Sequence, residues 1–414
     1  MKQAEAETPR DIGLRVMLTV MVPFACGYFL SYLIRNVNAV IAPDLVATFH
    51  LDASDLGLLT SAYFLGFALF QFALGVLLDR YGPRRVEGSL LIVAACGALI
   101  FGASQGTSML ILGRVLIGVG VSACLMAAFK ANAIWFARER LPAMNGWILG
   151  AGGLGALCST APVEWMLHWM DWRTLFVVFA AAFAAVSALI FGLVPERHDN
   201  TPPATVSEQF RGFVQIAATR EFWRIAPLNM ASQSAFMALQ GLWAARWMKD
   251  VGGFGRDEVA NYLLLAAIGM VAGHLTMGNL ATRLARDGIP PSRVAGTGVA
   301  IAIMVQATMV AGYTGMQPLI WLMFGFFGAS GTLCFAILAQ TCPVSMAGRA
   351  NTALNLTLFA TTFLVQWGIG VVINRYPLDN GSYAPEGYAL AFGVTAALQV
   401  AALVWFFRRM PRPA

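Results

Sequence analysis

The chain has 414 residues, of which 58% are hydrophobic and only 12% are charged, and its mean hydropathy is +0.68. A soluble domain is nearer half apolar and a quarter charged, so this composition excludes a soluble globular protein and predicts a polytopic membrane protein. The formal net charge of +6 is spread over short connecting segments. Because nucleic acid is bound by a continuous basic surface, we expect no nucleic-acid partner.

Twelve apolar segments are long enough to cross a lipid bilayer, which takes about 20 apolar residues in a helix. We therefore predict an all-α integral membrane fold with twelve transmembrane helices. The polar residues 1–12 precede an apolar run that is too long for a signal peptide, so we expect that run to remain as the first span. In chain order, the predicted spans are residues 14–42, 55–79, 86–104, 108–136, 144–168, 173–194, 223–248, 257–281, 293–313, 316–341, 347–374 and 386–408.

A polar segment between the sixth and seventh spans predicts two halves. It contains Pro195, Glu196, Arg197, Pro202 and Pro203, and is typical of a linker. We expect an N-terminal six-helix bundle, a cytoplasmic linker and a C-terminal six-helix bundle. Their predicted bounds are residues 1–194, 195–222 and 223–414.

The basic residues predict the orientation, because cytoplasmic loops of membrane proteins carry an excess of Lys and Arg. With the N-terminus inside, most of the 27 basic residues fall in cytoplasmic segments. We therefore expect both termini in the cytoplasm and the protein in the plasma membrane, which is the inner membrane of a bacterium. The basic residues on the outer side are Arg173, Arg246, Lys249, Arg256 and Arg375.

The first predicted span carries a positive charge on an aromatic face. Tyr28, Tyr32 and Arg35 follow the spacing that places side chains on one side of a helix. Arg35 lies about 12 Å before Pro43, the expected helix end, at 1.5 Å per residue. A charge at that depth is costly and indicates function, although an arginine paired with backbone carbonyls or a structural acid is the alternative. Because a guanidinium binds carboxylate or phosphate through two parallel hydrogen bonds, this face is a candidate anion site.

The connection between the second and third spans has the most specific motif. It resembles the loop signature of the major facilitator superfamily, Gly-x-Leu-x-Asp-Arg-x-Gly-x-Arg-Arg, at all seven fixed positions. The alternative is a basic loop of some other membrane protein. The matching residues are Gly75, Leu77, Asp79, Arg80, Gly82, Arg84 and Arg85.

The resemblance implies two pseudo-symmetric six-helix bundles with a binding site between them at the middle of the membrane. A weak internal repeat agrees with this architecture, because residues 278–283 repeat part of the motif, with Thr282 at the position of Asp79. Proteins of this superfamily are transporters that work by alternating access, so no enzymatic activity is expected.

The resemblance also implies a cytoplasmic gate built on the loop motif. Asp79 is expected to face the N-terminus of the eleventh span, near residues 346–349, where the helix dipole attracts a negative charge. The degenerate second copy leaves open whether the gate is symmetric. The expected gating residues are Gly75, Asp79, Arg80, Gly82, Arg84, Arg138 and Arg140.

The fourth span carries two further cations. Arg114, followed by Gly118 and Gly120, resembles the fourth-span motif of the superfamily, whose arginine serves proton coupling or braces the first helix. Lys130 lies nearer the cytoplasmic end, where it either extends to the interface or forms the floor of a cavity. The sequence leaves these alternatives open.

Polar side chains of the second half are expected to complete the site by hydrogen bonding. The same groups can instead hold helices together, as the glycines in residues 150–155 are expected to do for spans five and eight. Ala238 repeats the position of Arg35, so the expected site has one cation and suits a carboxylate better than a dianionic phosphate. The candidate polar residues are Gln233, Gln240, Trp243 and Asn355.

Proton coupling has few candidate residues. No Asp or Glu lies deep in any predicted span. Glu164, near an outer end, and His274, in the eighth span, are the candidates that we consider, because a histidine titrates near neutral pH. A lone helical histidine can equally be structural.

The string from Tyr32 to Arg35, followed by Pro43, resembles the first span of organic-phosphate and organic-anion transporters of the superfamily, in which the arginine binds the anionic group of the substrate. We therefore expect proton-coupled import of a small organic anion. The alternatives are a drug or metabolite exporter of the same fold and a non-transporting membrane receptor. We expect a monomer without cofactor or metal, since none of the six cysteines has metal-ligand spacing.

Overall fold

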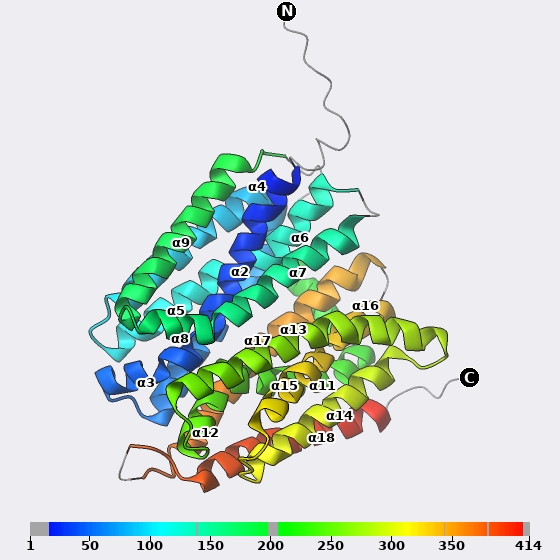
Figure 1. Cartoon of the computed structure of the whole chain (residues 1–414). Helices are drawn as coiled ribbons and strands as arrows, with labels where there is room; N and C mark the ends of the chain where they lie inside the picture. The colour runs from blue at the N-terminus through cyan, green and yellow to red at the C-terminus, as the bar shows by residue number, and fades with distance from the viewer. Residues whose placement is uncertain (1–15, 138–139, 198–205, 343, 379–380, 409–414) are drawn as a thin grey trace, which may run out of the picture.

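The computed structural model describes residues 16–137, 140–197, 206–342, 344–378 and 381–408, and these are almost entirely helical. Figure 1 shows two bundles, one formed by the helices up to α9 and the other by the helices from α11 onward. The described residues contain ten helices that are long and apolar enough to cross a membrane, or eleven if one bent pair counts as a single span. This agrees with the predicted all-α membrane fold.

The first half contains the six predicted spans, three of them interrupted. The first span is divided at Val37, the fourth is divided near Ser122, and the fifth is bent by 44°. The second and third spans form one continuous element. The elements are η1 (Met17–Met21), α2 (Val22–Asn36), α3 (Asn38–Phe49), α4 (Ala53–Gly102), α5 (Thr107–Val121), α6 (Cys124–Trp135), α7 (Leu141–Cys158), α8 (Ala161–Leu167) and α9 (Trp172–Leu193).

The second half follows a helix, α10 (Val206–Ala217), which lies in the predicted linker and packs against α17 and α4. The other elements are α11 (Arg220–Ala238), η3 (Leu239–Trp243), α12 (Ala244–Asp250), α13 (Arg256–Arg286), α14 (Pro291–Val310), α15 (Gln317–Gly328), η4 (Ala329–Thr332), α16 (Leu333–Thr341), α17 (Val344–Ile373) and α18 (Pro385–Arg408).

Of the twelve predicted spans, the seventh is the one that falls outside the eleven. It consists of α11, η3 and α12, and it carries several buried polar residues, among them Asn229, Ser232, Gln233 and Arg246. Polar side chains lower the hydropathy of a helix, and they are tolerated in a membrane protein where they face other helices. The burial of this helix inside the second bundle therefore explains its polar composition.

A single glycine turns the chain between the second and third spans. Gly82 has φ 76° and ψ 165° inside α4, a backbone conformation that glycine adopts freely and other residues do not. The sequence motif predicted a short connection at this place. The structure therefore explains the glycine of the motif by the backbone conformation that the turn requires.

The glycines of α7 allow close packing with two partners. A Cβ atom at Gly155 would lie 2.1 Å from the carbonyl oxygen of Phe29, and one at Gly152 would lie 2.4 Å from the ring of Tyr28, both on α2. Gly153 faces Val271 of α13. The expectation that this glycine run packs span five against span eight is therefore correct for Gly153, while the other two glycines pack α7 against the first span.

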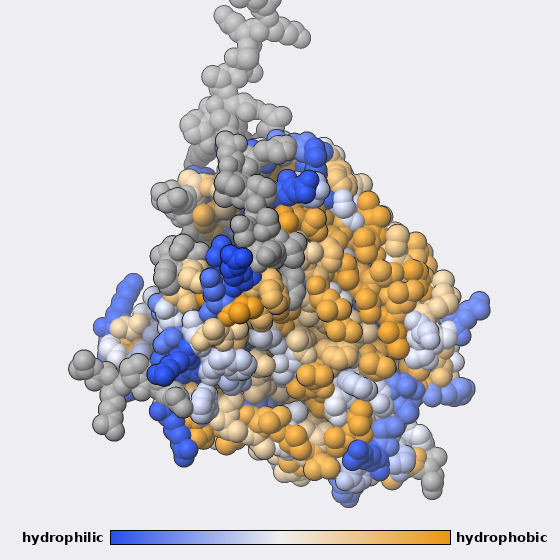
Figure 2. Space-filling model, turned by 180° about the vertical axis from the view of Figure 1, so that it is seen from behind, coloured by the Kyte–Doolittle hydropathy of each residue, from blue (hydrophilic) through white to orange (hydrophobic). Residues whose placement is uncertain are grey.

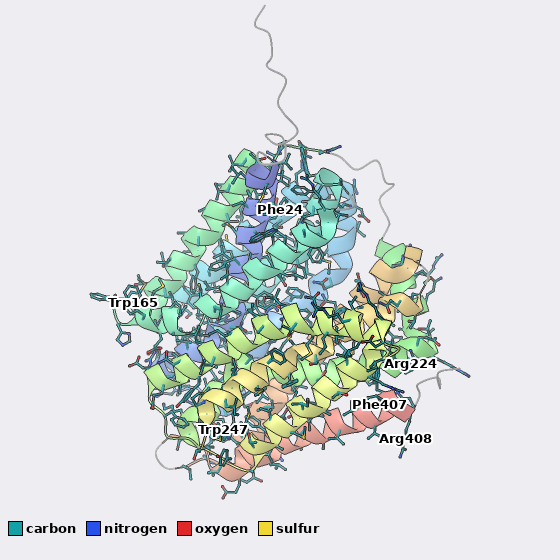
Figure 3. All side chains as sticks on the ribbon, turned by 45° about the vertical axis from the view of Figure 1, so that its right-hand side comes forward. Phe24, Trp165, Arg224, Trp247, Phe407 and Arg408 are labelled. Carbon is teal, nitrogen blue, oxygen red and sulfur yellow. The ribbon has the colours of Figure 1, made fainter. Side chains whose placement is uncertain are left out.

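The surface suits a bilayer. Figure 2 shows a broad hydrophobic area on one face of the molecule, with hydrophilic residues toward its edges. Large apolar side chains such as Leu69, Leu154 and Leu275 are well exposed on these helices. At the end near α8, Trp165 projects from the bundle, whereas Trp247 is enclosed within the second half (Figure 3). Exposed apolar side chains over the length of the helices indicate a surface covered by lipid.

Replacing Gly155 by valine should separate α7 from α2, because the new side chain would meet the backbone of Phe29. Overpacking of this kind costs about 1–3 kcal/mol. We expect a lower thermal unfolding temperature in detergent for Gly155→Val than for the wild type. Gly150→Val is the matched control on the same helix, since nothing lies within 4 Å of a Cβ atom there. Equal unfolding temperatures for the two variants would contradict this packing.

Candidate functional site

Arg35 lies at the end of α2 among aromatic rings. Its side chain is largely buried, with 9% exposure. The guanidinium carbon lies 4.5 Å from the ring centre of Tyr32, 5.9 Å from that of Tyr63 and 5.8 Å from that of Phe67. Arg35 Nε donates a long hydrogen bond of 3.4 Å to the Tyr63 hydroxyl. Cation–π contacts of this kind stabilise a desolvated guanidinium while leaving its remaining N–H groups available.

The same arginine touches the second half. The Phe359 ring of α17 lies 5.5 Å from the guanidinium, and it stacks on Phe67 of α4 with ring centres 4.1 Å apart. Arg35 therefore lies where the two bundles meet. In the part of the chain that the structure describes, no Asp or Glu forms an ion pair with it. Among these residues, nothing supports the alternative that Arg35 is paired with a structural acid.

Tyr28 and Tyr32 lie on the Arg35 side of α2, as the helical spacing predicted. Their rings meet edge to face, with centres 5.2 Å apart. Tyr28 is buried against α7 at Gly152, and Tyr32 lies between Tyr28 and the guanidinium. The structure therefore brings the predicted face together, with Tyr32 in contact with the charge and Tyr28 one turn behind it.

Arg114 of α5 holds the backbone beside Arg35. One of its terminal nitrogens donates a 3.0 Å hydrogen bond to the carbonyl oxygen of Ile34. Its guanidinium carbon lies 4.8 Å from the Phe101 ring centre and 5.4 Å from that of Phe176. Of the two alternatives for this residue, this hydrogen bond favours bracing of the first helix over proton coupling.

The predicted polar residues of the second half differ in whether their side chains are free to bind a substrate. The Gln233 amide donates a 2.7 Å hydrogen bond to the Gly328 carbonyl, so it ties α11 to the chain at the end of α15. Trp243 is fully buried and donates to the Gln366 carbonyl at 3.0 Å. These hydrogen bonds favour a packing role for both Gln233 and Trp243. Gln240 is buried, and Asn355 is half-buried one turn before Phe359, so Asn355 lies nearer to the face that Arg35 contacts.

The loop motif forms its contacts within the first half. Asp79 pairs with Lys130 of α6, with 2.6 Å between Nζ and Oδ1. No hydrogen bond or ion pair joins Asp79 to the predicted partner region at 346–349 among the described residues, and its carboxylate pairs with Lys130. Lys130 is held by this ion pair and lines a small cavity beside the loop motif.

The remaining motif arginines contact the end of α9. Arg84 donates a 2.5 Å hydrogen bond to the Phe191 carbonyl, and Arg84 and Arg85 both approach Glu196. Arg80 lies over the Tyr81 ring at 5.4 Å. Gly75 lies within α4, and Arg140 is exposed. Arg138 lies outside the described residues.

Three charged residues join the halves at the predicted outer end. Arg256, the first residue of α13, donates two 2.9 Å hydrogen bonds to the Asp44 carboxylate of α3. Its Nε also lies 2.9 Å from the Glu164 carboxylate of α8. We call Asp44, Glu164 and Arg256 the outer latch. A cavity of about 220 Å³ lies beside it and is lined by both halves.

Two further contacts close the same end. Asn374, after α17, donates a 3.0 Å hydrogen bond to Asp52, and the Tyr383 hydroxyl accepts one of 2.8 Å from the backbone N–H of Ala53. The structure is therefore closed at the predicted outer end. Glu164, which the sequence offered as a proton carrier, is a member of the outer latch in this conformation.

Sequence reasoning missed Arg256 as a partner and missed one buried acid. Glu87 of α4 is completely buried within the window Ala73–Gly102, which is apolar enough to cross a membrane. The expectation that no Asp or Glu lies deep in a span did not consider this group, which lies five residues after the turn at Gly82 and is enclosed by neighbouring helices. The helix continues from this turn and carries Glu87 into the bundle. His274, by contrast, is exposed on α13.

No group of three or more His, Cys, Asp or Glu side chains with the geometry of a metal site occurs in the described ranges. All six cysteines are free thiols. The arrangement around Arg35 offers a candidate site for binding by charge and aromatic contact where two helical bundles of a membrane protein meet.

The comparison with known proteins agrees with this architecture. The family model described as Major Facilitator Superfamily matches residues 24–370, and the chain belongs to this family. Its members are transporters and not enzymes. The family assignment agrees with the loop motif at residues 75–85.

Several curated relatives are similar in sequence. The chain is 27% identical to the hexuronate transporter of Escherichia coli (strain K12) over 63% of its own length and 64% of the relative, which is less than two thirds of that relative. It is 21% identical to the hexuronate transporter of Bacillus subtilis (strain 168) over 89% of this chain and 91% of the relative. It is 25% identical to the galacturonate transporter of Dickeya chrysanthemi over 63% of this chain and 81% of the relative.

Solved structures share the fold. A bacterial homologue of the human lysosomal transporter Spinster, in an inward-facing and occupied conformation, superposes with a TM-score of 0.73 at 17% identity, covering 94% of this chain and 95% of that one. The D-xylose–proton symporter superposes with a TM-score of 0.71 at 13% identity, covering 95% of this chain and 98% of that one. Both superpositions cover nearly the whole chain, so the chain shares the fold of these structures.

Arg256→Gln should weaken the outer latch. The arginine is partly exposed, and ion pairs of that kind contribute about 0.2–1 kcal/mol each, so the closed state should lose population without unfolding. A cysteine introduced at Val40, which lines the cavity beside the latch, should then react faster with a membrane-impermeant thiol reagent. Arg375→Gln, at an exposed arginine near the same end, is the control. Identical labelling rates in the two variants would mean that the outer latch does not hold this end closed.

Proposed function

We propose that the protein is a secondary transporter that imports a small organic anion, with a carboxylate as its charged group, together with a proton. One observation carries the proposal. The Arg35 guanidinium lies between the two halves, enclosed by Tyr32, Tyr63, Phe67 and Phe359, and without an acidic partner among the described residues.

A buried charge without a counter-charge is costly, and an anionic ligand offsets that cost. A carboxylate can accept two parallel hydrogen bonds from the guanidinium, and Tyr32 and Tyr63 supply aromatic walls and hydroxyl groups. Arg114 is fully buried, donates to the Ile34 carbonyl and lies against two rings, so we assign it to bracing α2 rather than to contact with the anion. One cation suits a monoanion better than a dianionic phosphate.

The relatives support a sugar acid as the substrate. Their names state hexuronate and galacturonate, each a sugar with one carboxylate and several hydroxyl groups. The hydroxyl groups need hydrogen-bonding partners, for which Asn355 and Gln240 of the second half are the candidates. We therefore propose a hexuronate as the first substrate to test.

The proposed cycle is alternating access. The outer latch closes one end, and the Asp79–Lys130 pair and the motif arginines lie at the other. Breaking the outer latch while the inner ends approach would expose Arg35 to the outside. With most basic residues at the inner end, both termini are proposed to face the cytoplasm of a bacterial cell, and the protein is proposed to lie in its inner membrane.

Arg35→Ala should abolish uptake of radiolabelled galacturonate into proteoliposomes while the protein is still inserted and folded. A hydrogen bond to a charged group contributes about 1.5–3 kcal/mol, which corresponds to about a tenfold to hundredfold loss of affinity. Arg35→Lys should restore uptake only in part, because an ammonium group lacks the planar fork. Arg286→Ala, at an exposed arginine at the end of α13, is the control. Unchanged affinity in Arg35→Ala would refute the anion site.

An inward proton gradient should drive accumulation of galacturonate. One proton moved with one monoanion transfers no net charge, so a difference of about one pH unit can support about tenfold accumulation. We expect accumulation to stop when a protonophore collapses the gradient, and equilibrating exchange to continue. Accumulation that persists after the gradient has collapsed would exclude proton coupling.

A further inference from the structure

A carboxyl group lies enclosed inside the first half, apart from the Arg35 site. Glu87 of α4 has no exposed surface. Neither of its carboxyl oxygens has a hydrogen-bond partner in the described part of the chain. A buried polar atom of this kind needs an explanation, and at functional sites the explanation is often chemical.

The carboxyl group occupies a notch in the first span. A Cβ atom at Gly27 of α2 would lie 2.1 Å from Oε1 of Glu87 and 3.3 Å from its carboxyl carbon. Only a residue without a side chain leaves room for the carboxyl group there. Glu87 is therefore pressed against the backbone of the helix that carries Arg35.

The surroundings of Glu87 contain no basic partner among the described residues. On α6, the Cys124 thiol is the titratable group that faces the carboxyl. On α2, the nearest residue is Gly27. On α9, Phe191 and the Ser187 hydroxyl contact the neighbouring Gly88, and Ser187 donates to its carbonyl at 2.7 Å. No ammonium or guanidinium group pairs with Glu87 in this arrangement.

An ionised carboxylate in such a position would lack water and a counter-charge, with only the weak thiol donor of Cys124 beside it, and this is a costly state for a buried acid. The neutral acid is therefore the form that fits the closed arrangement of α2 and α4. The charged form requires water or a donor, which can reach the group only if α2 moves away from α4. Proton occupancy of Glu87 and the position of α2 are thus linked.

We propose that Glu87 is the proton-binding group of the transport cycle. The carboxylate takes up one proton from water that reaches it on the outer side when α2 and α4 are apart, and the resulting acid allows them to pack as in this structure; a later separation that admits water from the inner side returns the proton to that water. Tyr28 follows Gly27 directly on α2, and Tyr32 and Arg35 follow one and two turns later, so the same helix movement reaches the anion site. This inference rests on the proposed proton-coupled transport.

Two other acidic or basic candidates are less suited to this role. Glu164 is held by Arg256 in the outer latch, and His274 is exposed on α13. Of these three groups, Glu87 alone combines complete burial, the absence of a basic partner among the described residues and contact with the helix that carries Arg35.

The test is Glu87→Gln, which keeps the shape and fixes the neutral state. In proteoliposomes, the variant should exchange radiolabelled galacturonate across the membrane but should not accumulate it in response to a proton gradient, so its accumulation ratio should fall to one. Asp287→Asn, at an exposed acid after α13, should accumulate as the wild type does. Full accumulation by Glu87→Gln beside an accumulating wild type would overturn this inference alone, whereas a wild type that takes up no galacturonate would contradict the proposed function.

A second measurement does not depend on transport. The infrared spectrum of the purified protein at neutral pH should contain a carbonyl band of a protonated carboxylic acid that is absent in Glu87→Gln. Gly27→Ala should shift or remove the same band, because its methyl group displaces the carboxyl from the notch. If the wild type and Glu87→Gln have the same spectrum in this region, Glu87 carries no proton and the inference is wrong.

Discussion

The positive charge of Arg35, buried between two bundles without a fixed counter-charge, is the constraint on which the rest of the site depends. Tyr32, Tyr63, Phe67 and Phe359 stabilise the guanidinium through their ring faces without neutralising it. Arg114 fixes the carbonyl of Ile34 and hence the backbone before the charge. Since Phe359 comes from the second half and the other three rings from the first, binding an anion at Arg35 is sensitive to how the halves meet.

The outer latch is suited to reversible closure. Arg256 pairs with Asp44 and Glu164 through short contacts, yet it is 44% exposed, so water screens the attraction. Exposed ion pairs contribute about 0.2–1 kcal/mol, which biases a two-state equilibrium without fixing it. At the other end, Asp79 and Lys130 pair within the first half, so this contact braces the loop and leaves the two inner ends unlinked by it.

The sequence predicted features whose causes are local. The face of Tyr28, Tyr32 and Arg35 follows from helical spacing, and the turn at Gly82 follows from a motif within one loop. The outer latch could not be predicted, because Arg256 meets Asp44 across 212 positions of sequence and Glu164 across 92. The burial of Glu87 was missed for a related reason, since only the approach of Gly27 from another helix encloses it. Gln233 and Trp243 had the right residue types for binding, but tertiary contacts engage both in packing.

The central claim is that Arg35 selects a ligand by its charge. A thermal unfolding series of the purified protein, with increasing galacturonate and with the uncharged sugar galactose, tests this most directly. A ligand that binds only the folded state raises the unfolding temperature as its concentration exceeds the dissociation constant. We predict a rise with galacturonate that grows with concentration and no rise with galactose. Equal shifts with the two sugars, or a shift with galactose alone, would contradict a site built on the charge of Arg35.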